Sequence, residues 1–261
     1  MHLSELERIL DVARESAREA GWMLASGQQS GFEVSHKGRI DLVTDMDLRA
    51  ERMLVKRIQH HFPEHGILAE EEGRQGGDGD VLWIIDPLDG TTNYAHGYRF
   101  FAVSIAVQVE GVTQVGVVHD PVVDECFSAI RGAGASLNGR RIGVSETSRL
   151  IDSMLATGFS YDRDRIAENL RLFCRATLSA QAVRRGSAAL DLSYVACGRF
   201  DGFWEQDLCP WDVAAGLLLV EEAGGRVSNY AGDECSVESP DFLVTNGQIH
   251  EALRELLAAG G

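Results

Sequence analysis

Positively charged residues are scarce in this chain of 261 residues. It holds 24 lysines and arginines against 40 aspartates and glutamates, for a formal net charge of −16 at pH 7. Proteins that grip nucleic acid need clustered lysine and arginine, so this balance argues against direct nucleic-acid binding. We expect most of the acidic excess to be solvated surface, and the remainder to gather in a cation site.

Paired cysteines and long apolar runs are also missing. The five cysteines are scattered, odd in number and form no C-x-x-C pair, which disfavours a disulfide framework or a zinc site. Residues 1–25 lack the apolar segment of a signal peptide, and no apolar run is long enough to span a bilayer. These absences predict a cytoplasmic protein without a membrane partner.

Several catalytic signatures are absent as well. The chain has no G-x-x-x-x-G-K-[ST] loop, no G-x-S-x-G elbow and no H-E-x-x-H motif. Its eight histidines show no metal-ligand spacing. Any chemistry must therefore be built from other residues, and the acids are the abundant choice.

The hydrophobic pattern changes character near residue 148. Before it, two amphipathic helices (4–26 and 47–62) precede strands that form an antiparallel meander. After it, short strands alternate with helices, which implies crossovers over a second sheet. We predict an N-terminal α+β subdomain (1–147) and a C-terminal α/β subdomain (148–261) that act as one unit, with a cleft where they meet.

The individual elements follow from the same pattern. The expected strands are 67–69, 81–85, 101–109, 112–119, 125–130, 154–157, 181–184, 202–205 and 242–245, and the later helices are 163–177, 188–197, 212–223 and 248–258. We expect residues 27–40 to form a loop or loose hairpin, 75–80 a surface loop and 132–139 a turn.

Residues 83–94 (WIIDPLDGTTNY) carry the strongest functional signal. An apolar strand leads into Asp86 and Asp89, two hard oxygen ligands of the kind that Mg²⁺ prefers. Pro87 restricts the backbone between them, and Gly90 lets the chain turn so that the following amides and hydroxyls can meet an anion. This pattern predicts a magnesium-dependent phosphatase that acts on a small phosphorylated metabolite.

Two other acids occupy similar positions. Glu70 ends a short apolar strand, and Asp212 stands in the first turn of an apolar helix. Asp86 and Asp89 could instead be helix caps, and Asp212 could be a first-turn acid favoured by the helix dipole. A bridging aspartate flanked by further acids is nevertheless what a two-metal phosphoryl site requires, and the backbone carbonyl of Leu88 could complete a coordination sphere.

A further group of residues is assigned to supporting roles. Asp47 could orient the Thr91 hydroxyl as a proton acceptor, whereas Thr44 and Asp45 could simply cap the second helix. Lys37 is either a solvated lysine or part of a loop that closes over the metals. Gly186, Ser187 and Ala188 open a helix whose free amides could touch an anion or a hydroxyl, and Glu205 could accept hydrogen bonds from substrate hydroxyls or be an exposed strand-end acid.

With these motifs in place, the chain resembles the inositol monophosphatase family of magnesium-dependent, lithium-sensitive phosphatases. The resemblance is carried by residues 83–93 and by residues 211–225, which begin Trp211-Asp212-Val213-Ala214-Ala215-Gly216. It extends from about residue 6 to residue 258. Residues 184–211 are most similar to the bacterial extragenic-suppressor branch, and Ala69 departs from the glycine that often precedes the Glu-Glu pair.

The resemblance implies a fold, ions and residue roles. It implies a layered αβαβα sandwich, commonly dimeric, with two Mg²⁺ ions and a weaker third ion. Glu70, Asp86 and the Leu88 carbonyl would hold the first ion, and Asp86, Asp89 and Asp212 the second. Gly90 and Thr91 would take phosphate oxygens, Thr91 with Asp47 and Glu70 would orient the attacking water, and Gly186, Ser187, Ala188 and Glu205 would line the alcohol end of the substrate.

Other functions stay open from the sequence. Inositol-1-phosphate leads as substrate, but histidinol phosphate, fructose-1,6-bisphosphate and 3′-phosphoadenosine phosphates suit similar metal sites. Asp45-Met46-Asp47 superficially offers the D-x-D of an aspartyl-phosphate enzyme, although these residues precede a helix. The extragenic-suppressor branch also implies association with RNA polymerase and Nus factors in transcription antitermination.

Overall fold

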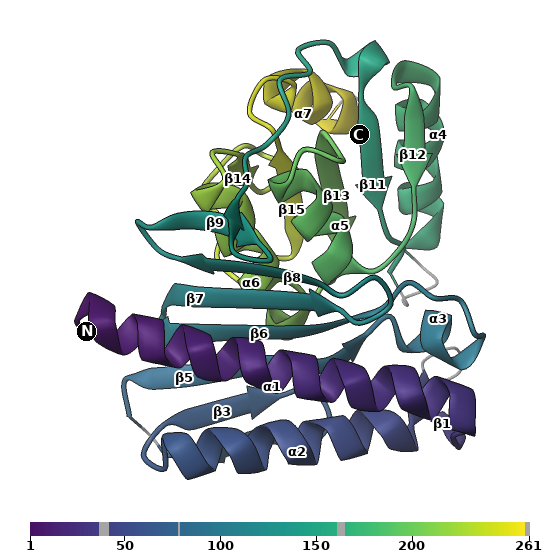
Figure 1. Ribbon diagram of the computed structural model, residues 1–261. Helices are drawn as coiled ribbons and strands as arrows, with labels where there is room; N and C mark the ends of the chain where they lie inside the picture. Colours follow the sequence, from purple (N-terminus) through teal and green to yellow (C-terminus); the bar gives the residue numbers. More distant parts are fainter. Residues whose placement is uncertain (37–41, 78, 161–164, 259–261) are drawn as a thin grey trace.

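The computed structural model describes residues 1–36, 42–77, 79–160 and 165–258 as five stacked layers (Figure 1). Helices α1 (Leu3–Ser30) and α2 (Asp45–His61) cover one face of an eight-stranded sheet. Helices α5 (Ala188–Ala196) and α6 (Pro210–Glu222) lie between this sheet and a five-stranded sheet. Helices α4 (Ile166–Ser179) and α7 (His250–Ala258) form the outer layer. The predicted αβαβα sandwich is confirmed.

The eight-stranded sheet has the order β10-β9-β8-β7-β6-β5-β3-β4. Its strands are β3 (Gly66–Ala69), β4 (Gly73–Gly76), β5 (Val81–Asp89), β6 (Ala102–Val109), β7 (Val112–Asp120), β8 (Glu125–Ile130), β9 (Gly134–Leu137) and β10 (Arg140–Arg141). Strands β5 to β8 form the expected meander, and only the β3–β5 pair among these neighbours is parallel. Strands β4 and β9 were not predicted because their glycine and polar residues give no strand pattern, and pairing with a neighbouring strand makes them extended.

The five-stranded sheet has the order β12-β11-β13-β15-β14. It contains β11 (Met154–Thr157), β12 (Ala182–Arg184), β13 (Gly202–Gln206), β14 (Arg226–Ser228) and β15 (Asp241–Thr245). The β11–β12 and β11–β13 pairs are parallel, with α4 and α5 as crossovers, and β15 is antiparallel to both its neighbours. The predicted crossovers are therefore present, and β14 is an additional three-residue edge strand.

Short elements lie around the two sheets. The expected loose hairpin is a pair of three-residue strands, β1 (Val34–His36) and β2 (Leu42–Thr44). Lys37 falls between them, outside the described residues. Helix α3 (Thr91–Ala95) follows β5 directly, and a 3₁₀ turn spans Leu150–Asp152.

Helix α6 shows why the middle layer is so apolar. Its residues from Val213 to Val220 are all buried, because the helix has a sheet on both sides. A helix that is hydrophobic all round belongs in such a double-sided core. No helix in the described part of the chain combines the length and the apolar character needed to cross a membrane.

Candidate active site

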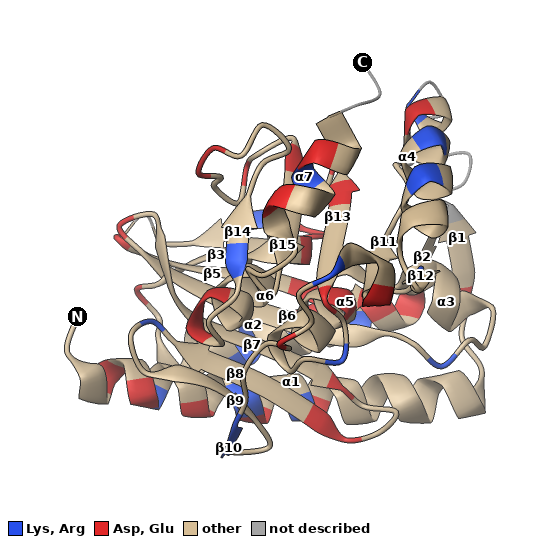
Figure 2. Ribbon diagram, turned by 90° about the horizontal axis from the view of Figure 1, so that it is seen from above, with Lys and Arg blue, Asp and Glu red and all other residues tan. Residues whose placement is uncertain are grey.

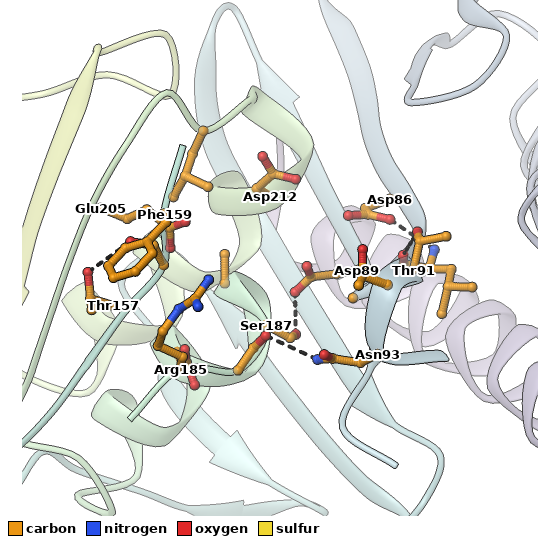
Figure 3. Close-up of a pocket in the computed structure, with 18 of the residues that line it drawn as sticks. Asp86, Asp89, Thr91, Asn93, Thr157, Phe159, Arg185, Ser187, Glu205 and Asp212 are labelled. Atoms are coloured by element: carbon orange, nitrogen blue, oxygen red, sulfur yellow. Dashed lines mark hydrogen bonds between the residues drawn. The ribbon is translucent and has the colours of Figure 1, made fainter. Parts of the chain in front are cut away.

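A cavity of about 420 Å³ lies where the two sheets and the middle helices meet (Figure 3). Its walls come from the ends of β3, β5 and β13 and from the first turns of α5 and α6. It is lined by the sequence-predicted residues Glu70, Asp86, Leu88, Asp89, Gly90, Thr91, Gly186, Ser187, Ala188, Glu205 and Asp212. The fold thus brings together eleven predicted positions that are up to 142 residues apart.

A bulge in β5 shapes the acidic end of this cavity. Asp86 pairs with Ser104 of β6 and Asp89 pairs with Ala102, so β5 holds one residue more than β6 over this span. Pro87 lies in the bulge, where its missing N–H costs no ladder bond. Gly90 then adopts a left-handed conformation with φ of 93°, which turns the chain into α3 and favours glycine.

Asp86 lies in the most acidic part of the site, among three other carboxylates. Its side chain is buried, and one carboxylate oxygen accepts a hydrogen bond from the Leu88 amide at 2.9 Å. Burial raises the pKa of Asp86 well above its ordinary value, and the nearby charges of Glu70, Asp89 and Asp212 raise it further. Four carboxylates within electrostatic reach of one another are a donor set that suits a divalent cation.

In this structure Asp89 and Asp212 accept hydrogen bonds at the N-termini of helices. Asp89 accepts hydrogen bonds from the Ser187 hydroxyl and, at 2.7 Å, from the Ala189 amide at the start of α5. Asp212 accepts one from the Cys209 amide at 2.7 Å, in a capping box on α6. No three His, Cys, Asp or Glu side chains in the described ranges are gathered tightly enough to chelate a metal as they stand.

The Thr91 hydroxyl is held by a buried aspartate behind the cavity. Thr91 Oγ1 lies 2.9 Å from Asp47 Oδ1, with the Leu88 carbonyl as a second acceptor at 3.1 Å. Asp47 itself is fully buried, and its other oxygen accepts hydrogen bonds from the Thr44 amide and hydroxyl. Both alternatives for this segment are therefore present, because Thr44 and Asp47 form the capping box of α2 while Asp47 orients Thr91.

The opposite end of the cavity is suited to a hydroxyl-rich group. Glu205 is buried there, and its pKa is raised by burial and by the charges of Asp191, Asp212 and Asp89. Figure 3 shows Glu205 and Phe159 at the far side of the cavity from Asp86 and Thr91. The Arg185 guanidinium lies 4.1 Å from the Phe159 ring centroid, which fixes one cation on this wall.

Glycine at position 158 makes room for this carboxylate. A Cβ atom added at Gly158 would overlap the Glu205 side chain, and one added at Gly186 would lie 2.3 Å from a ring carbon of Phe100. Both glycines therefore let the backbone approach the substrate end of the cavity.

Comparison with known proteins shows which family this chain belongs to. The family model described as "Inositol monophosphatase family" matches residues 5–260. This chain belongs to the inositol monophosphatase family. It is 45% identical to the inositol-1-monophosphatase of Synechocystis sp. over 98% of this chain and 91% of that protein. It is also 44% identical to the Nus factor SuhB of Escherichia coli, over 94% of each.

Solved structures agree with the family assignment. The extragenic suppressor protein suhB from Bartonella henselae matches with a TM-score of 0.94 and 39% identity, over 97% of this chain and all of that one. The inositol monophosphatase from Anabaena (Nostoc) matches with a TM-score of 0.88 and 46% identity, over 98% and 97% of the two chains.

Two supporting residues in this inositol monophosphatase fold escaped the sequence analysis. Glu51, fully buried on α2, accepts the Glu71 amide at 2.8 Å and the Glu72 amide at 2.7 Å, and so holds the turn that begins at Glu70. The sequence feature that could have identified Glu51 is the presence of an acid on the apolar face of an amphipathic helix. Asn93 donates to the Gly186 carbonyl at 3.1 Å and thereby joins the β5–α3 segment to the loop before α5. It lay inside the recognised motif but received no role.

Proposed function

We propose that this protein is a Mg²⁺-dependent phosphomonoesterase that hydrolyses inositol-1-phosphate to inositol and phosphate. The observation that carries the proposal is the cluster of four carboxylates around the buried Asp86, beside the Thr91–Asp47 pair. Membership of the inositol monophosphatase family and the 45% identity to an inositol-1-monophosphatase support the substrate.

The carboxylates are proposed as the metal ligands. Glu70, Asp86 and the Leu88 carbonyl would hold one Mg²⁺, and Asp86, Asp89 and Asp212 a second, with Glu70 contributing to a weaker third ion. Lys37 remains a proposal for the closing loop. Bound Mg²⁺ supplies a water of lowered pKa and neutralises charge that develops on the leaving oxygen.

The protein's own groups would position the attacking water. Because Thr91 donates its proton to Asp47, a lone pair of its hydroxyl is left to accept a proton from that water. Glu70 accepts the other hydrogen bond, so the water oxygen faces phosphorus in line with the leaving alkoxide. Gly90 and Thr91 take phosphate oxygens. Gly186, Ser187, Ala188 and Glu205 line the inositol, and no phosphoenzyme forms.

A substrate panel tests this function. The purified protein is assayed for phosphate release from inositol-1-phosphate, histidinol phosphate, fructose-1,6-bisphosphate and 3′-phosphoadenosine 5′-phosphate, with Mg²⁺ and with or without Li⁺. We expect the highest kcat/KM for inositol-1-phosphate and inhibition by Li⁺. Hydrolysis of another panel member at a kcat/KM at least tenfold higher would replace the substrate, and no Mg²⁺-dependent turnover would refute the class.

A second, regulatory function is supported by the relatives named Nus factor SuhB. We propose association with a transcription complex of RNA polymerase and Nus factors, through protein contacts and not through RNA, given the net charge of −16. Pull-down of these proteins by both the wild-type and the Asp86→Asn chain would support a role separate from catalysis. Recovery of none of them would remove it.

Assembly and location complete the proposal. We propose a cytoplasmic homodimer in which residues 1–147 and 148–261 of each chain form one functional unit, because the cavity takes walls from both parts. Analytical ultracentrifugation at micromolar concentration tests the dimer, since a single species at the 28.5 kDa monomer mass would contradict it.

A further inference from the structure

One basic side chain lines the acidic cavity of the proposed active site. Among the described residues that form the cavity wall, Arg185 is the one lysine or arginine, and it shares the wall with six acids. Figure 2 shows that acidic segments also outnumber basic ones on the molecule as a whole. None of the roles proposed for the metal ligands or for Thr91 involves this arginine.

Aromatic packing holds the Arg185 side chain in place. Its guanidinium carbon lies 4.1 Å from the centroid of the Phe159 ring. Phe159 in turn packs edge-on against Phe173 of α4, with ring centroids 5.7 Å apart. Figure 3 shows the guanidinium end of Arg185 reaching into the cavity beside Phe159. Stacking uses the face of the guanidinium, so the N–H donors in its plane stay available to a ligand.

Glu205 lies at the same end of the cavity as this arginine. Its carboxylate packs against Gly158, where an added Cβ atom would overlap it, and Phe159 is the next residue along the chain. Burial and the charges of nearby acids raise the pKa of Glu205, whereas the Arg185 charge lowers it. The Arg185 charge thereby favours the ionised form of Glu205, which accepts hydrogen bonds.

These two opposite charges define the group that fits beside them. A carboxylate only accepts hydrogen bonds, and a guanidinium only donates them. A phosphate or carboxylate at this end of the cavity would be repelled by Glu205, and an amine would be repelled by Arg185. A hydroxyl suits both side chains, because it donates to the carboxylate while its oxygen accepts from the guanidinium.

We propose that Arg185 is a substrate-binding residue that, together with Glu205, recognises adjacent hydroxyls of a polyol phosphate. The planar fork of Arg185 donates to two neighbouring hydroxyl oxygens, and one of these hydroxyls donates its proton to Glu205. The inference rests on the phosphatase function proposed above and names the residue by which this chain selects a hydroxyl-rich alcohol. A phosphate ester whose alcohol lacks hydroxyls gains nothing from Arg185.

Two phosphate esters with the same ring test this assignment. Inositol-1-phosphate carries free hydroxyls, whereas cyclohexyl phosphate keeps the ring and the ester without them. With Mg²⁺, the wild type should show the higher kcat/KM for inositol-1-phosphate. Arg185→Met should lower that kcat/KM about 10- to 100-fold, as expected for hydrogen bonds lost from a charged donor, and should change kcat/KM for cyclohexyl phosphate less than about twofold.

Further variants separate recognition from damage to the fold. Arg184→Met changes the adjacent arginine, which is exposed at the end of β12 outside the cavity lining, and should leave both substrates unaffected. Arg185→Lys keeps the charge without the planar fork and should lose part of the preference for inositol-1-phosphate. The Tm rise on adding Mg²⁺ should be the same in Arg185→Met as in the wild type, because the proposed metal ligands are unchanged.

A double-mutant cycle tests whether the two residues act on the same hydroxyls. Glu205→Gln should reduce the preference for inositol-1-phosphate by itself. Combining it with Arg185→Met should cost less than the product of the two single losses, because each variant already disturbs the shared hydrogen bonds. Independent losses would contradict joint recognition.

Three further results would overturn the proposal. They are equal losses of kcat/KM for both esters in Arg185→Met, an unchanged kcat/KM for inositol-1-phosphate, and a wild-type preference for inositol-1,4-bisphosphate that disappears in Arg185→Met. The last result would show that Arg185 binds a second phosphate. All three leave the phosphatase function standing, whereas the absence of Mg²⁺-dependent turnover of any ester by the wild type would refute that function and this inference with it.

Discussion

Replacing Asp89 by asparagine should stabilise the metal-free protein while abolishing its magnesium response. Burial is the largest cause that raises the pKa of Asp89, from 3.8 to about 6. A carboxyl whose pKa is raised on folding stabilises the fold at low pH, and this contribution is lost as pH rises from about 4 through about 6. A rise in pKa from 3.8 to about 6 corresponds to about 3 kcal/mol of stability lost at pH 7.

Asparagine does not ionise, so the variant should escape this loss. The raised pKa already includes the hydrogen bonds from Ser187 and Ala189, because these favour the charged form and lower the value. The expectation at pH 7 in EDTA is therefore a gain of up to about 3 kcal/mol, or a Tm rise of roughly 6–12 °C at about 2–4 °C per kcal/mol for a chain of this size. At pH 4 the difference should nearly vanish, because the wild-type carboxyl is then largely protonated and as neutral as the amide.

Scanning calorimetry with and without Mg²⁺ measures both effects. Wild-type protein should gain Tm on adding Mg²⁺ at pH 7, and Asp89→Asn should show little gain and no phosphatase turnover. Asp86→Asn should likewise abolish turnover in a folded protein. Asp120→Asn serves as a matched control, since Asp120 is a buried acid outside the cavity whose pKa is also raised by burial, and its Mg²⁺ response should stay normal. An Asp89→Asn protein with wild-type Mg²⁺-dependent turnover would refute the ligand assignment.

Three further predictions follow from other contacts. Glu51→Gln places an amide N–H₂ against one of two backbone amides, so it should lower the free energy of unfolding in urea by about 2 kcal/mol and weaken Mg²⁺ binding about tenfold by calorimetry. Arg52→Gln, at an exposed ion pair, should change neither quantity. Equal effects of the two variants would deny Glu51 a positioning role. The pKa of His250 is lowered to about 4, mainly by burial, so on going from pH 7 to pH 4.5 the wild type should lose about 2 kcal/mol of stability relative to His250→Gln. The same pH dependence in both proteins would contradict this cause. Gly158→Ala should displace Glu205 and raise KM for inositol-1-phosphate at least tenfold with a smaller effect on kcat, and an unchanged KM would remove Glu205 from the substrate site.

Local patterns predicted the elements with long apolar periods. The amphipathic α1 and α2, the meander and the crossover helices were foreseen because each buries one regular face. The short strands β4, β9 and β14 were not foreseen. Their short, polar or glycine-containing sequences carry no periodicity, and they become strands only because a neighbour offers unpaired backbone groups.

The site divides in the same way. Asp86, Asp89 and Gly90 could be chosen from sequence because Glu70 and Asp212 occupy similar positions and because residues 83–93 match a family signature. Glu51 and Asn93 could not be chosen, since each acts by a hydrogen bond to a backbone group that is distant in sequence and close only in the folded chain. The caps that Asp89 and Asp212 form on α5 and α6 likewise depend on how the helices dock.

The amino-acid sequence by itself determined the alternation of apolar faces, and hence the layers, together with the family and the acids that we propose as metal ligands. Tertiary structure alone decided that Glu70, Asp89 and Asp212 lie close enough to Asp86 in one cavity to raise its pKa. The reason is physical, because periodicity and propensity act over a few residues, whereas burial and Coulomb interactions depend on distances that only the folded chain sets.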